Sequence, residues 1–185
     1  MSKRQWAKSF KKTAASSHFN RKIQEKIRQA KAKGLRCYDL LQILKNAPNF
    51  LGVFPADQLQ NLYIMSYPTF LIANIDDSHQ RGSHWISIRI SKKNVEIFDS
   101  LGFDSILWGK TSPNLLYFLN RYLSSHKFLY SPVLQAKNSA SCGLFSAFFI
   151  RNRQKFSFEQ CCNFFSRNLY QNDEKLLRFF RNRFT

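Results

Sequence analysis

Thiol-based catalysis is the chemistry that four residues of this chain could perform together: His84, Asp99, Gln135 and Cys142. A cysteine nucleophile needs a base to accept its proton, a group to orient that base, and donors for the negative charge that develops on the substrate oxygen. We interpret His84 as the base, Asp99 as the orienting acid and Gln135 as a donor to the oxyanion. The hypothesis is a catalytic group in the chain order His, Asp, Gln, Cys.

Each of these residues also has a purely structural interpretation. Free cysteine is among the most buried residue types, so Cys142 in the stretch Ser-Ala-Ser-Cys-Gly-Leu-Phe can be a core thiol. His84 can be a strand-end histidine that bonds a backbone carbonyl, and Asp99 can be a turn former. Gln135 can be an exposed loop residue. The joint arrangement favours catalysis, because chance does not readily place all four in suitable surroundings.

The elements around the acid and the base predict that they meet. Residues 85–90 alternate strictly between apolar and polar, and residues 95–98 alternate again after the turn-like segment Ser-Lys-Lys-Asn. Two such runs are typical of a hairpin, and the apolar run at 70–75 is a neighbouring strand of the same sheet. Across this hairpin His84 and Asp99 are almost opposite each other. The hairpin itself is therefore expected to bring the acid to the base.

Cys142 stands where a polar loop becomes a helix. Residues 142–151 are apolar nearly all round, which is typical of a central buried helix. At the start of a helix, free backbone N–H groups and the positive end of the dipole favour a thiolate. Gln135 lies earlier in the same loop, so its amide N–H is expected to reach an oxyanion beside the N–H of Cys142.

The remaining patterns predict one α+β domain without internal repeats. Gly34 is placed to end the first helix, and Asp39 is expected to be the N-cap of the second. Helices are expected at 18–33, from 39 to 44, at 113–123 with Leu123 buried, at 158–165 and at 172–183, and a further strand at 128–134. The stretch around Gly52 and Pro55 is expected to be a loop. The predicted fold is a small mixed sheet flanked by helices.

Positive charge is concentrated at the N-terminus. The formal net charge is +18, and residues 1–36 contain twelve Lys and Arg against the single acid Glu25. We interpret 1–36 as a basic extension, partly disordered or helical, and 37–185 as the catalytic domain. Such a field attracts polyanions, nucleic acid before an anionic membrane surface, although a solvated basic tail is the simpler alternative. The candidate nucleic-acid contacts are Lys3, Arg4, Lys8, Lys11, Lys12, Arg21, Lys22 and Arg28.

The cysteines and the hydropathy exclude several classes of protein. The four cysteines include the adjacent pair Cys161 and Cys162, whose mutual disulfide would be strained, and no pair has zinc-finger spacing. We therefore expect reduced thiols and no metal or cofactor. No apolar run reaches the length of a membrane span, and the N-terminus lacks the apolar stretch of a signal peptide. These features indicate a nuclear, cytosolic or virion-interior setting.

Three motifs resemble those of the adenovirus-type cysteine endopeptidases, the adenain family, whose clan includes SUMO-deconjugating proteases. They are His84-Trp85, then Phe98-Asp-Ser-Leu-Gly102, then Gln135-Ala-Lys-Asn-Ser-Ala-Ser-Cys142-Gly-Leu-Phe145. The segment Asn-Phe-Leu-Gly at 49–52 is also similar, and the resemblance spans roughly 38–180. It implies a papain-like cysteine protease arrangement. In it His84 is the general base, Asp99 orients it, Cys142 attacks the peptide carbonyl, and Gln135 forms the oxyanion hole with the Cys142 N–H.

The resemblance also implies a biological role. It implies a monomeric endopeptidase of a virophage or related DNA virus, which cleaves capsid precursor proteins at Gly-containing sites during maturation. The setting would be the virion interior, or the host cytoplasm or nucleus during assembly, with viral DNA as a stimulating polyanion. Two features depart from the family: the acid is Asp99 rather than Glu, and residues 120–134 contain no cysteine to capture an activating peptide. The alternatives are a nucleic-acid-binding virion protein without protease activity and a deconjugase of ubiquitin-like proteins.

Overall fold

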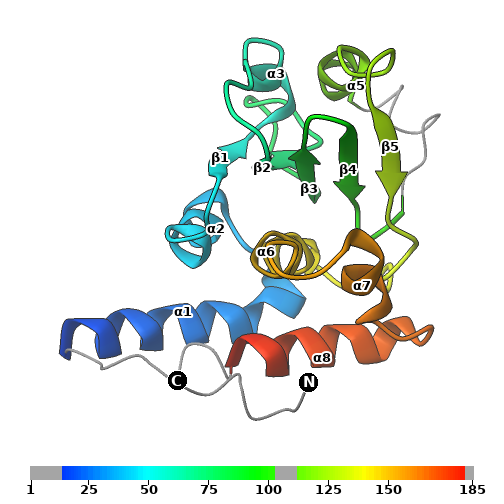
Figure 1. Ribbon diagram of the computed structural model, residues 1–185. Helices are drawn as coiled ribbons and strands as arrows, with labels where there is room; N and C mark the ends of the chain where they lie inside the picture. Colours follow the sequence, from blue (N-terminus) through cyan, green and yellow to red (C-terminus); the bar gives the residue numbers. More distant parts are fainter. Residues whose placement is uncertain (1–13, 103–111, 182–185) are drawn as a thin grey trace.

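The protein has an α+β fold in which helices cover both faces of one sheet (Figure 1). The structure is a computed structural model that describes residues 14–102 and 112–181. Its strands are β1 (Phe50–Phe54), β2 (Thr69–Asn74), β3 (Trp85–Ile90), β4 (Asn94–Phe98) and β5 (Lys127–Tyr130). Its helices are α1 (Ala14–Lys33), α2 (Cys37–Leu44), α3 (Ala56–Leu59), α5 (Pro113–Asn120), α6 (Cys142–Asn152), α7 (Phe158–Asn163) and α8 (Leu169–Arg181).

The sheet is mixed, as the sequence predicted, and its strands follow the chain order β1-β2-β3-β4-β5. The central pairs, β2 with β3 and β3 with β4, are antiparallel, whereas the outer pairs, β1 with β2 and β4 with β5, are parallel. The predicted hairpin of β3 and β4 is confirmed, with Ser87 opposite Phe98. The start of β3 and the end of β4 therefore lie at the same end of the hairpin.

Two strand predictions were wrong for local reasons. The stretch around Gly52, expected to be a loop, contains the edge strand β1 and is followed by the short helix α3. An irregular register between Phe50 and Gly52 interrupts the alternation that reveals a strand. The strand expected at 128–134 ends at Tyr130, because Pro132 has no backbone N–H for a strand ladder.

Several helix predictions were wrong at their ends. The helix expected at 172–183 begins at Leu169, and the one expected at 158–165 ends at Asn163. Helix α2 begins at Cys37, so Asp39 is not its N-cap but lies in its first turn, where the carboxylate accepts the N–H of Arg36 at 3.0 Å. Helix α5 ends at Asn120, and Leu123, expected to be buried, is 58% exposed. Apolar periodicity identifies a helix more securely than the residue at which it stops.

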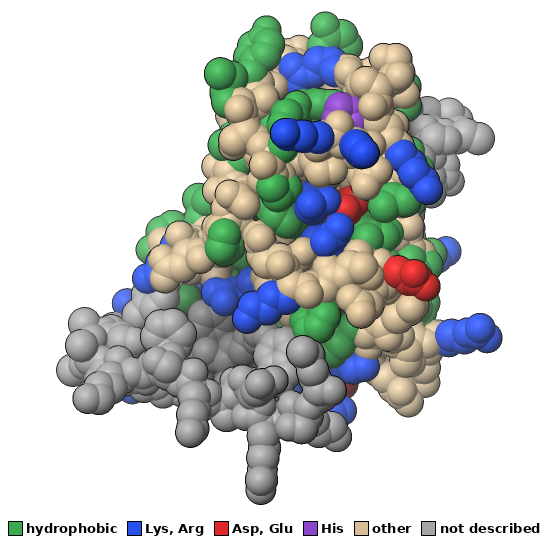
Figure 2. Space-filling model, in the orientation of Figure 1, with side chains coloured by type: hydrophobic (Ala, Val, Ile, Leu, Met, Phe, Trp, Pro, Cys, Tyr) green, Lys and Arg blue, Asp and Glu red, His purple; other side chains and the backbone are tan. Residues whose placement is uncertain are grey.

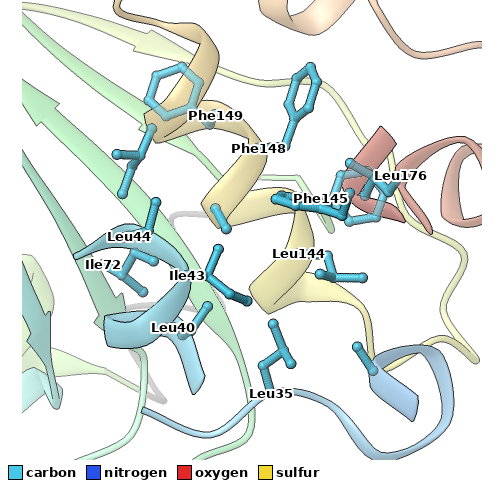
Figure 3. Close-up of a cluster of buried hydrophobic side chains, with 14 of the residues drawn as sticks. Leu35, Leu40, Ile43, Leu44, Ile72, Leu144, Phe145, Phe148, Phe149 and Leu176 are labelled. Atoms are coloured by element: carbon cyan, nitrogen blue, oxygen red, sulfur yellow. The ribbon is translucent and has the colours of Figure 1, made fainter. Parts of the chain in front are cut away.

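Two apolar cores lie on opposite faces of the sheet. The smaller packs α3 and α5 against residues such as Leu71 and Ile88. The larger encloses α6, which is buried at every residue from Cys142 to Ile150. Figure 3 shows α2 and α8 contributing side chains on either side of α6. The ring of Phe149 also stacks on Phe98 of β4 at 4.6 Å. The predicted central buried helix is therefore confirmed.

Helix α1 shares this larger core with the rest of the chain. Ile23, Ile27 and Ala30 are buried in it, and α1 lies beside α8 along the lower side of the molecule (Figure 1). Gly34 ends the helix with a φ of 70°, a left-handed conformation that glycine adopts readily. The domain boundary between residues 36 and 37 stays a prediction, but the described part of the basic segment packs against helices of the predicted catalytic domain.

In the part of the chain that the structure describes, no helix has the combined length and apolar character needed to span a bilayer.

Substitution Ile27→Ala tests whether α1 belongs to the core. We expect the free energy of unfolding to fall by about 2 to 5 kcal/mol, because the substitution leaves a cavity beside buried neighbours. Urea denaturation of the full chain measures this. The matched control is the exposed neighbour Arg28→Ala, for which we expect a change within about 0.5 kcal/mol. Equal effects of the two substitutions would show that α1 contributes little to the fold.

Candidate active site

The β3–β4 hairpin brings His84 and Asp99 together. His84 directly precedes β3 and Asp99 directly follows β4, so both lie at the same end of the hairpin. Nε2 of His84 is 2.7 Å from Oδ1 of Asp99, and both side chains are buried. This is the juxtaposition that strand alternation and the position of the turn predicted.

Asp99 is held in place by residues that sequence analysis did not single out. The hydroxyl of Ser131 accepts the backbone N–H of Asp99 at 2.8 Å and donates to its carbonyl at 2.7 Å. The N–H of Leu101 donates to Oδ1 of the carboxylate at 2.9 Å. Ser131 directly follows β5, and the pairing of β5 with β4 places it beside Asp99. No local pattern marked this serine.

Cys142 is the first residue of α6, and its interaction with the His84 imidazole is one of the causes that raise the pKa of that imidazole. Because Nε2 of the imidazole is engaged by Asp99, Nδ1 is the nitrogen left for the sulfur. Two serines also join the helix to the strand that follows His84: Ser87 donates to the carbonyl of Ser146 at 2.9 Å, and Ser146 donates to the carbonyl of Trp85 at 3.2 Å. The helix of the thiol and the strand of the imidazole are thus fastened to each other.

The electrostatics of the group favour a charged imidazole. Burial by itself lowers the pKa of His84, but the hydrogen bonds to Asp99 and Cys142 and the negative charges of both outweigh it and raise the pKa from 6.5 to about 9. His84 is therefore an imidazolium at neutral pH. An adjacent cation stabilises a thiolate, so the arrangement suits a thiolate–imidazolium pair.

Gln135 is buried and its amide is firmly oriented. Oε1 accepts the hydroxyl of Ser100 at 2.6 Å, and Nε2 donates to the carbonyl of Ser139 at 2.5 Å. The backbone N–H of Gln135 also donates to the carbonyl of Ser100, the residue after Asp99. An amide nitrogen has two hydrogens, so a second donor exists besides the one that bonds Ser139. The loop of Gln135 is thereby tied both to the turn of the acid and to the approach to Cys142.

Trp85, the residue after His84, forms part of the wall of a cleft of about 470 Å³, which none of the four candidate catalytic residues lines. The Trp85 indole N–H donates to the carbonyl of Leu35, another wall residue, at 2.8 Å. A Cβ added to Gly143 would be 3.1 Å from Cβ of Leu35 and 3.3 Å from Cδ1 of Trp85. The residue after the thiol therefore has to be small for Leu35 and Trp85 to approach it so closely.

The cysteines of α7 differ from Cys142 in their environment. All four cysteines of the chain are unpaired. Burial raises the pKa of Cys161 to about 11 and that of Cys162 to about 12, so both stay protonated. They pack in or against the larger core.

The predicted nucleic-acid contacts lie elsewhere on the molecule. Arg21, Lys22 and Arg28 occupy exposed positions on α1, and Arg28 is 3.7 Å from Glu25. The other five, Lys3, Arg4, Lys8, Lys11 and Lys12, lie outside the described residues. Figure 2 shows further Lys and Arg side chains scattered over the described part of one face of the molecule, with few acidic groups among them. The structure thus does not single out one site for a polyanion.

The titration of His84 tests the pairing. We expect a pKa near 9 for its imidazole by NMR, and a clearly lower one in Asp99→Asn, because burial then acts against a smaller negative charge. Since the folded-state pKa is raised above 6.5, the stability that the charged imidazole confers is full below pH 6.5 and is lost as the pH rises through 9. An unchanged titration in Asp99→Asn would contradict the pairing.

Known proteins share features of this chain's sequence and fold. The profile of the adenovirus endoprotease family matches residues 50–164, which include all four candidate catalytic residues. No curated protein gives a significant match. Similar solved structures include the SUMO protease Ulp1 with its catalytic cysteine oxidized to a sulfinic acid, at 11% identity and a TM-score of 0.44, covering 95% of this chain and 98% of that one. Another is AvrA delL154 with IP6 and CoA, at 16% identity and a TM-score of 0.45. This match covers 78% of this chain and 61% of that one. Because the family profile spans more than half of the chain, this protein belongs to the adenovirus endoprotease family.

Proposed function

We propose that this protein is an active cysteine endopeptidase whose nucleophile is Cys142. The observation that carries the proposal is the chain of contacts from Asp99 through His84 to Cys142, with the imidazole pKa raised to about 9. Thiol peptidases need this pairing of a thiolate with an imidazolium held by a third group. Burial raises the pKa values of the two α7 thiols, Cys161 and Cys162, so neither competes for the role.

The reaction proceeds in two stages. The Cys142 thiolate attacks the carbonyl carbon of the scissile peptide, and the oxyanion receives hydrogen bonds from the Cys142 N–H and the second N–H of Gln135. His84 then protonates the leaving amine, which leaves a thioester on Cys142. A water that gives its proton to His84 attacks this thioester, and the acid product departs as the thiolate is restored. Asp99 keeps the imidazole in place throughout.

The proposed substrates are capsid precursor proteins, cut at Gly-containing sites in the virion interior or in the host cytoplasm or nucleus. Leu35 and Trp85 approach the Gly143 position closely, and this crowding beside the thiol supports a preference for small residues at the cut. The enzyme would act as a monomer, with viral DNA as its second partner and no metal or cofactor. A deconjugase of ubiquitin-like proteins would also accept glycine, so the substrate test includes both classes.

Substitution Cys142→Ala tests the activity. Coexpression with a capsid precursor should give cleaved product with the wild type and none above background with Cys142→Ala, because the thioester cannot form. The matched control is Cys162→Ala, which removes a partly buried thiol of α7 and should leave cleavage intact. Cleavage that persists without Cys142 would leave a nucleic-acid-binding virion protein as the better description. Cleavage of Gly-Gly-terminated conjugates, but not of the precursor, would indicate a deconjugase.

Nucleic acid is proposed to recruit the enzyme through its basic surface. The net charge of +18 supports this, as do the exposed cations of α1. Removal of residues 1–36 would test it poorly, because Ile23, Ile27 and Ala30 are part of the larger core. Charge-removing substitutions on the outer side of α1 leave that core intact.

The triple variant Arg21→Gln, Lys22→Gln and Arg28→Gln tests this recruitment. If all three residues contact phosphates, the slope of log affinity against log salt concentration should become shallower by about 2 to 3. Fluorescence anisotropy with a DNA duplex measures the slope. The matched control is Lys92→Gln, Lys93→Gln and Lys127→Gln, three exposed lysines where the β3–β4 turn meets β5. A slope that changes only in the control would place the contacts on the sheet instead.

A further inference from the structure

The three residues that precede Cys142 are held by two helices: Ser139 and Ser141 by α8, and Ala140 by α1. Oδ1 of Asp173, on α8, accepts the hydroxyl of Ser139 at 2.9 Å and also the hydroxyl of Ser141. Between them, the N–H of Ala140 donates to the carbonyl of Lys31, in the last turn of α1, at 3.0 Å. The approach to the thiol is therefore anchored residue by residue.

These anchors lead directly to the groups that would receive the oxyanion. The carbonyl of Ser139 accepts the amide of Gln135, so the position of Ser139 determines where that amide points. The carbonyl of Ser141 accepts the N–H groups of Leu144 and Phe145 at 2.8 and 3.2 Å, which starts α6 at Cys142. A displacement of Ser139 or Ser141 would thus move both donors of the proposed oxyanion hole.

Asp173 is an acidic residue in a buried position, so its carboxyl group needs hydrogen-bond donors. Its side chain is 1% exposed, and no cation lies within salt-bridge distance of it among the described residues. A buried carboxylate without a cation costs more free energy than a neutral side chain, unless hydrogen bonds satisfy it. The side-chain donors to it are the two serine hydroxyls of the loop before the thiol, and both bind Oδ1.

The residues on either side of Asp173 extend the same connection. Nδ2 of Asn172 donates at 2.9 Å to the carbonyl of Leu134, which precedes Gln135. The carboxylate of Glu174 is 3.1 Å from Nζ of Lys31, whose carbonyl holds Ala140. Successive residues of α8 therefore bind the start of the loop, its end, and the helix that holds its middle.

We propose that Asp173 is a positioning residue for the oxyanion hole, and that α8 with the last turn of α1 forms a clamp on residues 134–141. The clamp consists of Asn172, Asp173 and the Lys31 carbonyl. The inference rests on the proposed peptidase function and adds a residue outside the His84, Asp99, Gln135 and Cys142 group. It acts on Gln135 and Cys142 through Ser139 and Ser141, without touching the substrate.

The variants Asp173→Ala and Asp173→Asn test the clamp in the full chain. Asp173→Ala removes the acceptor, whereas Asp173→Asn keeps an oxygen in the same place. The control Glu159→Gln neutralises an exposed carboxylate on α7. Three quantities are measured: kcat and KM on a peptide substrate per titrated thiol, the rate at which iodoacetamide alkylates Cys142, and the melting temperature. Alkylation needs the activated thiol but no oxyanion hole, so it separates the two parts of the site.

We expect Asp173→Ala to lower kcat by about 10- to 100-fold with little change in KM or in the alkylation rate, because only the donors to the transition state are displaced. Asp173→Asn should recover most of kcat, and Glu159→Gln should match the wild type. A lower melting temperature with an unchanged kcat per titrated thiol would overturn the positioning role and leave a structural one.

Two further outcomes are a variant that does not fold and a wild type without peptidase activity. If Asp173→Ala does not fold, Ser139→Ala is tested instead, because it removes the hydroxyl that links Asp173 to Gln135 and destabilises the fold less. Its kcat should also be lower than that of the wild type. An unchanged kcat in Ser139→Ala would then overturn the inference. A wild type without thiol-dependent peptidase activity would overturn the proposed function itself, a result distinct from an active wild type that Asp173→Ala leaves unaffected.

Discussion

Helix α6 has to be enclosed on every side, and the rest of the structure is arranged around that requirement. Its residues from Cys142 to Ile150 are buried, and burial of this much apolar surface is a dominant favourable term in folding. The sheet covers one side of the helix, whereas α2 and the pair α1 and α8 cover the others. The N-terminal end of α6 meets the polar loop that precedes it, and the thiol of Cys142 lies there.

The acid and the base are positioned by a different kind of element. A hairpin has a register that a one-residue slip would invert, because side chains alternate between faces. Here both faces of β3 are buried: Ile88 packs toward α3 and α5, and Ser87 bonds the backbone of α6. The register is therefore fixed from both sides. Because His84 directly precedes β3 and Asp99 directly follows β4, this register also sets their contact.

Helix α1 combines two roles that its composition makes hard to separate. Its inner side contributes Ile23, Ile27 and Ala30 to the core, whereas its outer side presents cations to solvent. Mutual repulsion of those cations opposes compaction, and apolar burial offsets it. A polyanion on the outer side would relieve the repulsion. Because the carbonyl of Lys31 also holds Ala140, the basic surface and the approach to the thiol share one helix.

Local patterns in the sequence predicted the contact of His84 with Asp99, the position of Cys142 at a helix start and most of the fold. Alternation and a turn predicted the hairpin, and with it the contact of His84 with Asp99. The change from a polar loop to an apolar run predicted that Cys142 begins a buried helix. Strand β1 was missed, because its irregular register at Gly52 leaves no alternation to detect.

The residues that support the candidate catalytic group were decided by the tertiary structure alone. Ser131 reaches Asp99 across 32 residues of chain, and Asp173 reaches Ser139 across 34. A single hydroxyl or carboxylate leaves no periodic signal, and its partner depends on how separate elements pack. The sequence by itself therefore determined which residues could react, because strand and helix periods are local. Packing between elements that are distant in sequence decided which side chains hold those residues in position.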